Sequence, residues 1–226
     1  MPERPRIYLI IGCGRFGSRA AEKLLQKDPR SKLIVVDRSK KALGKISQLP
    51  VEFEVCDGTL YLEQFLSKGR KTDYIIPSVP FHLAFEFTLS QSKPWTGKRI
   101  KVPSLSGLPN PMIGKIGDLY TSLASFLCPE DCPEPAQYCS ITKQRRPKPL
   151  FRILEDMKAH FESSVIRSRQ LAPGVGGYSP EALLDLFENI KKRMEPGHTI
   201  LVSTSCRCHG VTSALSFSAN KKSRGD

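Results

Sequence analysis

Residues 6–38, RIYLIIGCGRFGSRAAEKLLQKDPRSKLIVVDR, decide the fold of this 226-residue chain. The stretch opens with an apolar run, Ile7–Ile11, that is short and β-branched enough to form a buried strand. A second apolar run, Leu33–Val36, leads directly to Asp37. Between the two runs lies a helical pattern, whose apolar face carries Phe16, Ala20, Ala21, Leu24 and Leu25. Strand, helix and strand in this order predict the first unit of a parallel sheet.

Three glycines stand between the first strand and the helix, at Gly12, Gly14 and Gly17, in the spacing G-x-G-x-x-G. The first allows a tight turn, the second lets the backbone approach a pyrophosphate, and the third lets helix and strand pack closely. The amides at the helix start then face the phosphates, and Asp37 can accept hydrogen bonds from ribose hydroxyls. The pattern predicts a Rossmann domain that binds NAD(H). The alternative is a doubly wound domain whose site is empty or binds another nucleotide.

The motifs at Gly12–Gly17 and Val35–Asp37 are followed by Cys-Asp-Gly-Thr at Cys56–Thr59. Together they resemble the TrkA-N, or RCK, family, which usually has Gly-Asp-Ala/Gly-Thr at the last of these positions. The resemblance covers about the first half of the chain. It implies NAD(H) or adenine-nucleotide binding, a role in regulating potassium channels or transporters, and a homodimer. The family's second, ligand-sensing domain is not recognisable in the second half.

The predicted cofactor site combines the glycine turn, the acid after the second strand and the ends of the third and fourth strands. In doubly wound folds the end of the fourth strand lies beside the dinucleotide, and here the strand Asp73–Val79 ends in Pro-Ser-Val-Pro. Asp37 repels the 2′-phosphate of NADP, whereas Arg38 can accept one, so the choice between NAD and NADP stays open. The predicted cofactor-binding residues are Gly12, Cys13, Gly14, Arg15, Phe16, Gly17, Asp37, Arg38, Asp57, Gly58, Ser78, Val79 and Pro80.

Strands and helices alternate through the rest of the first half. The pattern predicts helices over 40–48, 59–68 and 81–92, and strands over 51–56, 73–79 and 99–102. Prolines and glycines at 103–111 mark a boundary. We therefore expect a Rossmann dinucleotide-binding domain at 1–111 and a Cys-rich α/β region at 112–226.

The second half has its own alternating pattern. It predicts helices over 112–127, 149–160 and 180–193, strands over 165–171 and 198–205, and a glycine loop at 173–178. Ser179-Pro180-Glu181 is a strong helix start. This region either extends the first sheet or packs separately. In a continuous sheet, the glycine turn, Ser78–Pro80, the glycine loop and Cys206–His209 would all lie at the carboxyl edge.

Five of the seven cysteines form two groups, C-x3-C-x6-C and C-x-C-H. Clustered cysteines in an intracellular chain favour metal binding over disulfides, and short loops can bring thiolates together around a soft metal. Cys-Pro pairs at Cys128 and Cys132 are similar to iron–sulfur ligand loops. The expected centre is a 4Fe–4S cluster or zinc, held by residues among Cys128, Cys132, Cys139, Cys206, Cys208 and His209. Reduced free thiols, or a disulfide within C-x3-C, are the alternatives. His82 and His160 are expected to be core or solvated histidines.

Composition and charge exclude several classes of protein. No apolar run approaches the length of a membrane span, and MPERPR leads straight into the first strand, which predicts no signal peptide and a cytoplasmic protein without membrane insertion. The net charge of +13 is spread along the chain without an aromatic-interleaved basic motif, so a solvated basic surface is favoured over a nucleic-acid site. The chain has no H-E-x-x-H, P-loop or Ser-His-Asp motif.

These patterns favour a redox protein or oxidoreductase that combines NAD(H) with a cysteine-ligated metal centre, although they name no catalytic residue. The principal alternative is a soluble, nucleotide-sensing regulatory subunit of a potassium transport system, as the TrkA-N resemblance implies. A zinc-stapled nucleic-acid binder is a third reading, supported only by charge. The expected partners are the dinucleotide and either a redox partner or a membrane transporter.

Overall fold

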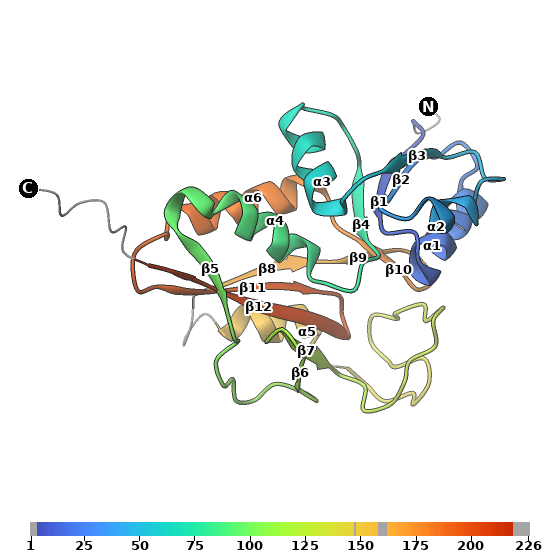
Figure 1. The fold of residues 1–226 in the computed structure, drawn as a ribbon. Helices are drawn as coiled ribbons and strands as arrows, with labels where there is room; N and C mark the ends of the chain where they lie inside the picture. Colours follow the sequence, from blue (N-terminus) through green and yellow to red (C-terminus); the bar gives the residue numbers. More distant parts are fainter. Residues whose placement is uncertain (1–3, 147, 158–161, 219–226) are drawn as a thin grey trace, which may run out of the picture.

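The N-terminal part of the chain forms a parallel sheet, as the alternation of strands and helices predicts. A computed structural model describes residues 4–146, 148–157 and 162–218 (Figure 1). Four parallel strands pair in the order β3-β2-β1-β4. The elements are β1 (Ile7–Ile11), α1 (Arg15–Lys27), β2 (Lys32–Asp37), α2 (Lys40–Gly44), β3 (Glu52–Val55), α3 (Gly58–Ser67), β4 (Tyr74–Pro77) and α4 (Leu83–Gln91). The predicted α/β class with a Rossmann-like sheet is confirmed.

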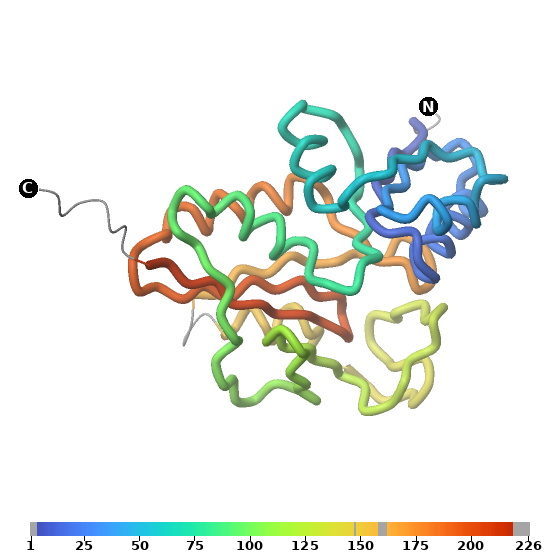
Figure 2. The backbone as a smooth tube through the Cα atoms, viewed as in Figure 1, coloured from blue at the N-terminus to red at the C-terminus, as the bar shows by residue number. Residues whose placement is uncertain are grey.

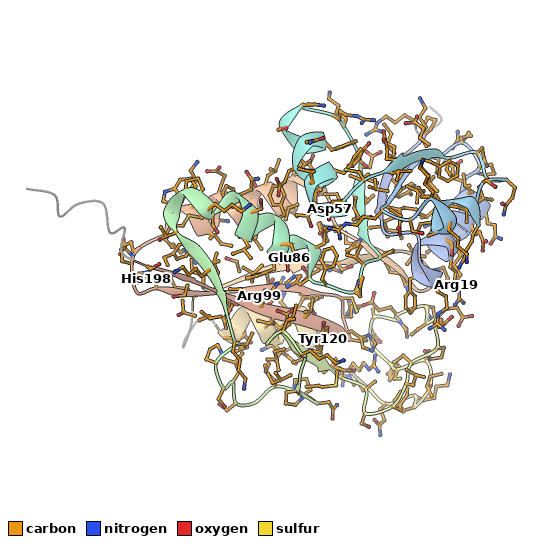
Figure 3. The ribbon with its side chains drawn as sticks, in the orientation of Figure 1. Arg19, Asp57, Glu86, Arg99, Tyr120 and His198 are labelled. Carbon is orange, nitrogen blue, oxygen red and sulfur yellow. The ribbon has the colours of Figure 1, made fainter. Side chains whose placement is uncertain are left out.

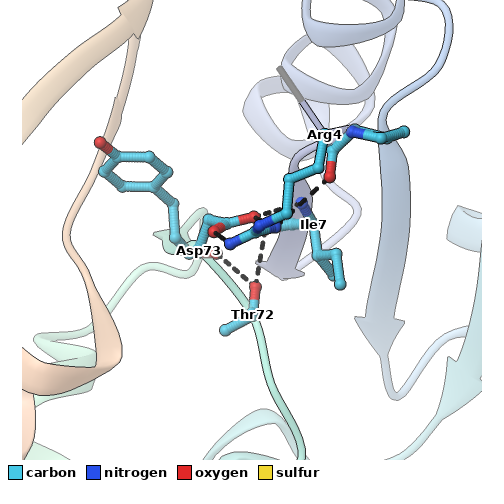
Figure 4. A network of polar contacts seen from close by, with 6 residues as sticks. Arg4, Ile7, Thr72 and Asp73 are labelled. Atoms are coloured by element: carbon cyan, nitrogen blue, oxygen red, sulfur yellow. Dashed lines mark hydrogen bonds and ion pairs between the residues drawn. The ribbon is translucent and has the colours of Figure 1, made fainter. Parts of the chain in front are cut away.

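The start of β1 is tied to the start of β4. The Asp73 carboxylate accepts a hydrogen bond from the Ile7 amide at 2.7 Å and forms an ion pair with Arg4 (Figure 4). The Thr72 hydroxyl donates to the Ile7 carbonyl at 2.9 Å. Because the rest of β1 is apolar and buried, these polar contacts help to fix its register against β4.

A second, mixed sheet occupies the other part of the molecule. Its strands run in the order β6-β7-β12-β11-β8, and β5 also pairs with β12. Only β8 and β11 are parallel to each other. In Figure 1, α4 and α6 lie over one face of this sheet and α5 over the other. The elements are the 3-10 helix η1 (Lys93–Trp95), β5 (Gly97–Ile100), β6 (Met112–Ile113), β7 (Leu119–Ser122), α5 (Leu150–Asp156), β8 (Glu162–Arg167), α6 (Pro180–Lys191), β11 (Thr199–Ser205) and β12 (His209–Phe217).

The predicted helix over 112–127 is wrong. This segment forms β6, a turn and β7, with Gly117 at φ +88° in the turn. Leu119 and Thr121 are buried while Tyr120 is exposed, which is the alternation of a strand with one face on a core. The predicted strand over 99–102 is found as β5, which pairs with β12 in the second sheet.

The region around the second glycine loop also differs from expectation. The predicted strand over 165–171 is divided between β8 and β9 (Arg169–Ala172), and residues of the predicted loop form β10 (Val175–Gly177), which pairs with β9 as an antiparallel hairpin. The helices α5 and α6 were predicted, and the Ser179 hydroxyl caps α6 as expected. The last residues of the predicted helix over 149–160, including His160, lie outside the described residues.

The two sheets are separate, and the β9–β10 hairpin joins them. Tyr178, just after β10, forms an antiparallel bridge with Ile75 of β4. The largest core cluster contains residues of both sheets, including Leu9 and Ile75 from the first and Val202 and Leu215 from the second. The second half therefore does not extend the first sheet with further parallel strands, but packs against it through a shared core.

Candidate functional site

The glycine turn after β1 has one open position and two tightly packed ones. Gly12 has φ +99°, and a Cβ there would collide with the carbonyl of Ser78. A Cβ on Gly17 would overlap the carbonyl oxygen of Gly12. Gly14, by contrast, has no atom within 4 Å of the position that a Cβ would occupy. Its backbone therefore faces open space at the start of α1, where a phosphate can approach.

The start of α1 is electrostatically suited to an anion. Gly14 is its N-cap, and no side chain caps it. The positive end of the helix dipole and the first amides of α1 thus point outward together. Arg15 adds a cationic side chain at the same place, where it forms an ion pair with Glu130 at 2.7 Å.

Asp37 lies at the end of β2 and supports the glycine turn. Its carboxylate accepts hydrogen bonds from the Cys13 amide at 2.7 Å and from the Ser39 amide at 2.8 Å. Each carboxylate oxygen has a further lone pair, so these bonds leave acceptor capacity for a ribose.

Arg38 forms an ion pair with Asp57, which also caps α3 by accepting a hydrogen bond from the Leu60 amide at 2.8 Å. Burial raises the pKa of Asp57, but the hydrogen bonds from Leu60 and Arg38 outweigh it and the pKa is lowered overall. Gly58 begins α3 and packs against Ile11. Arg38 is therefore held by a carboxylate rather than free to receive a phosphate.

The end of β4 borders a small pocket. The Ser78 amide donates to the Ile11 carbonyl at 2.7 Å, which places this end beside the glycine turn. Val79 and Pro80 line a cavity of about 260 Å³ together with His82, Tyr178 and Thr204. We call this cavity the Tyr178 pocket.

A larger cavity, of about 470 Å³, lies on the side of the molecule where α1 begins. We call it the cysteine cavity, because Cys128, Cys132, Cys139, Cys206, Cys208 and His209 all line it. Arg15 and Phe16 of the glycine turn and Gly174 and Gly176 of the β9–β10 hairpin also contribute to its wall. The structure thus brings both cysteine groups to the glycine turn, although the two halves do not share one continuous sheet.

The loop between β7 and α5 closes the cysteine cavity by docking on α1 and the hairpin. Figure 2 shows this loop passing next to α1 and the β9–β10 hairpin. Glu130 pairs with both Arg15 and Arg19. The Cys132 carbonyl accepts hydrogen bonds from the Gln170 side chain at 2.6 Å and from the Gly174 amide at 3.3 Å. Neither Glu130 nor Gln170 carries a sequence signal of this role, because each meets its partner only in the folded chain.

The thiols of the cysteine cavity differ in acidity. Hydrogen bonds from the backbone and side chain of Thr142 lower the pKa of Cys139 to about 7. Burial raises the pKa of Cys206 to about 12 and that of Cys208 to about 11. Arg146 donates to the sulfur of Cys208 and opposes part of that rise. A cationic guanidinium among the thiols favours their anionic form, which is the form that binds metals.

All seven cysteines are free thiols in the structure. Within the described residues, no three Cys, His, Asp or Glu side chains are arranged as ready metal ligands. The sulfur of Cys206 lies 3.9 Å from Nδ1 of His209 and accepts hydrogen bonds from the amides of Cys208 and His209 at 3.4 and 3.3 Å. A metal would therefore require the side chains around the cavity to move inward.

Comparisons with known proteins divide the chain in the same way as its sheets. The profile of the TrkA-N domain matches residues 8–68. A profile described as "Uncharacterized protein, C-terminal domain" matches residues 81–218, which is more than half of the chain. A protein of Archaeoglobus fulgidus, described as an uncharacterized protein, is 31% identical over 226 residues, covering 92% of this chain and 98% of its own length.

The first 68 residues thus contain a nucleotide-binding Rossmann domain of the TrkA-N type. In the parts of the chain that the structure describes, no helix has the length and apolar character needed to cross a bilayer. The match to the archaeal protein extends over nearly all of both chains, and the second profile covers most of the region that forms the mixed sheet. The chain belongs to the family of this archaeal protein, and in this chain a TrkA-N domain is followed by the region that matches the C-terminal-domain profile.

Proposed function

We propose that the protein binds NAD(H) and acts as a redox protein. The pyrophosphate would lie on the open backbone at Gly14 and the uncapped start of α1, the adenosine ribose on Asp37, and the nicotinamide end toward Ser78–Pro80. The open space at Gly14 carries this proposal, because it lies where a phosphate meets both backbone amides and the positive end of a helix. Calorimetric titration with NADH tests it directly.

We expect NADH to bind at least about tenfold more tightly than NADPH, a difference of about 1.4 kcal/mol. Asp37 repels the 2′-phosphate, and Asp57 holds the guanidinium of Arg38 that could otherwise bind it. In Asp57→Asn, which keeps a capping side chain on α3, Arg38 is released and NADPH affinity should rise several-fold. The control is Asp73→Asn, which removes the carboxylate charge paired with Arg4 at the opposite end of the strands. Equal affinity for the two dinucleotides in wild type would contradict the assignment.

We further propose that the cysteine cavity holds a thiolate-bound metal centre. Cys128, Cys132, Cys139 and Cys208 are the chosen ligands, because all four line the cysteine cavity, whereas the sulfur of Cys206 already accepts hydrogen bonds from the amides of Cys208 and His209. A single zinc ion holds each sulfur ligand at a Zn–S distance of about 2.3 Å, so its four ligands converge on one small atom. The cavity that these thiols line, of about 470 Å³, has room for the larger iron–sulfur cluster. Such a cluster would supply one-electron transfer, whereas zinc would be structural.

Protein purified without oxygen is expected to be brown and to contain iron and acid-labile sulfide. Cys132→Ser should lose most of the metal, because a serine hydroxyl is a poor substitute for a thiolate on a soft metal. Cys56→Ser is the matched control, since Cys56 follows β3 and does not line the cysteine cavity, and it should keep the wild-type metal content. Wild-type metal in Cys132→Ser would remove this residue from the ligand set. Stoichiometric zinc would make the centre structural.

One contact favours a second function, nucleotide-dependent regulation as in the potassium-transport proteins that TrkA-N domains serve. Glu130, in the loop between β7 and α5, pairs with Arg15 at the start of α1, where the phosphates would bind. A bound pyrophosphate competes with Glu130 for this guanidinium and can thereby loosen the loop. Faster proteolysis of the loop after nucleotide binding, with no turnover, would favour regulation over redox catalysis.

A further inference from the structure

A buried chain of hydrogen bonds crosses the second sheet below α4. His82 is 4% exposed, and its two ring nitrogens lie 2.8 Å from Oγ of Ser213 and 2.9 Å from Oγ1 of Thr204. The Ser213 hydroxyl donates to the Asp118 carboxylate at 2.7 Å. Asp118 is itself 1% exposed and pairs with Arg99. Four side chains thus form one connected path from Thr204 to a buried carboxylate.

The direction of each hydrogen bond in this chain follows from the Asp118 carboxylate at its end, which can only accept. Because the Ser213 hydrogen is given to Asp118, the oxygen of Ser213 accepts from Nδ1 of His82, which must carry the ring proton. Nε2 is then an acceptor, and the Thr204 hydroxyl donates to it. Burial lowers the pKa of His82 to about 3, so the ring is neutral at physiological pH. The oxygen of Thr204 can therefore accept a proton while its own hydroxyl proton passes to Nε2 of His82.

Thr204 and His82 also line the Tyr178 pocket, whose wall is otherwise mainly apolar. Tyr178 is 1% exposed, and its hydroxyl has no hydrogen-bond partner among the described residues. A buried hydroxyl without a partner is costly, and because the Tyr178 side chain lines the cavity, a polar atom of a ligand bound there would supply that partner. The volume of about 260 Å³ equals that of about nine water molecules, which is enough for a small ring.

We propose that the Tyr178 pocket is a substrate site for a small, largely apolar alcohol or the corresponding carbonyl compound. The Tyr178 hydroxyl donates to the oxygen of either compound, and the oxygen of Thr204 accepts the hydrogen bond of the alcohol. This inference deepens the proposed function and rests on it, because the pocket adjoins Val79 and Pro80, toward which the nicotinamide end of NAD(H) is assigned. Thr204 touches the substrate, and His82 and Ser213 pass its proton to the Asp118 carboxylate.

Oxidation of the alcohol to the carbonyl compound releases one proton and one hydride. The substrate O–H bond breaks and its proton goes to the oxygen of Thr204, while the Thr204 proton moves to Nε2 of His82. The Nδ1 proton of His82 passes to Ser213, whose own proton protonates the Asp118 carboxylate. His82 is neutral before and after the transfer. The C–H electrons leave as hydride to NAD⁺, the oxidant of the proposed function, and the O–H electrons form the carbonyl bond.

The first test measures binding without NAD. Cyclohexanone, an apolar ring with one acceptor oxygen, is titrated into labelled protein and followed by amide NMR shifts, which should change at Gly177, Tyr178 and Thr204. Tyr178→Phe should lower the affinity for cyclohexanone by about tenfold, the contribution of one hydrogen bond, and leave the affinity for methylenecyclohexane unchanged. The control is Tyr61→Phe, at a buried tyrosine on α3, which should alter neither of these two affinities. Cyclohexanone binding that is absent, or insensitive to Tyr178→Phe, overturns the inference.

The second test measures proton transfer. Thr204→Val should lower NAD⁺ reduction with cyclohexanol by about 100-fold or more, with unchanged NAD⁺ affinity, and Thr204→Ser should restore it. The two proposals fail in different ways. If cyclohexanone binds but NAD⁺ does not, the proposed function fails and the pocket remains. If NAD⁺ binds but cyclohexanol is not oxidised, or Thr204→Val oxidises it at the wild-type rate, the proton path is wrong.

Discussion

Gly17→Ala should destabilise the protein by about 3 kcal/mol, at or above the upper end of the usual cost of overpacking. A Cβ at this position overlaps the carbonyl oxygen of Gly12, and the atom that must yield is backbone rather than a flexible side chain. Gly12 in turn is fixed between β1 and the end of β4, because a Cβ there would already collide with Ser78. Neither side of the contact can move without shifting a buried strand. Urea unfolding followed by circular dichroism measures the loss.

The control is the same substitution three residues earlier. Gly14→Ala places its methyl group where no atom lies within 4 Å, so unfolding should be nearly unchanged. The new methyl group does lie in the space assigned to the pyrophosphate, and NADH affinity should fall. The two variants thus separate the packing role of Gly17 from the binding role of Gly14 within one glycine motif. Equal stability of Gly17→Ala and Gly14→Ala would show that the glycine turn is more compliant than its geometry indicates.

The N-terminal fold could be predicted because its signals are local. Ile7–Ile11, the glycine spacing and the apolar face of α1 all fall within about thirty residues and each points to the same unit. The strands of a parallel sheet are buried on both faces, so they appear as continuous apolar runs that are easily recognised. The N-cap of α6 at Ser179 was predicted for the same reason, since cap and helix are adjacent in sequence.

The second sheet could not be predicted equally well, because its strands depend on distant partners. β12 contains glycine, serine and threonine, and it becomes a central strand only by pairing with β5, β7 and β11. Residues 112–127 have apolar residues at spacings compatible with a helix, yet the glycine at φ +88° turns the chain back and produces β6 and β7. Tertiary pairing overrides local preference here.

The candidate sites also differ in how far they could be predicted from the sequence. The rule that ligand sites gather at the carboxyl ends of strands predicted Cys206–His209 beside the glycine turn only for a continuous sheet, whereas the structure brings both cysteine groups there from a separate sheet and its loop. Tyr178 and the His82 path had no such signal. His82 meets Ser213 and Thr204 across 131 and 122 residues of sequence, and His82 alone is indistinguishable from an ordinary core histidine. Only the fold shows that these residues share a pocket.

Arg99→Met should cost about 3–5 kcal/mol, the price of leaving one partner of a buried ion pair behind. The Arg99 side chain is 20% exposed and pairs with both Asp118 and Glu86, and Figure 3 shows Arg99 close to Glu86. Its guanidinium also lies 4.3 Å from the ring centre of Phe85. Methionine keeps much of the volume but removes the charge, so the buried carboxylate of Asp118 loses its cationic partner. Urea unfolding at neutral pH measures the difference.

A double-mutant cycle identifies the cause of that loss. If the cost arises from the unpaired carboxylate, Arg99→Met combined with Asp118→Asn should be more stable than the sum of the two single changes predicts, by about 1–3 kcal/mol. Arg152→Met is the control, because its ion pair with Glu155 is largely exposed and should contribute less than about 1 kcal/mol. Strict additivity in the cycle would mean that Arg99 acts through its packing on Phe85. Coupling would instead show that Arg99 stabilises the fold by balancing the charge of the buried Asp118 carboxylate.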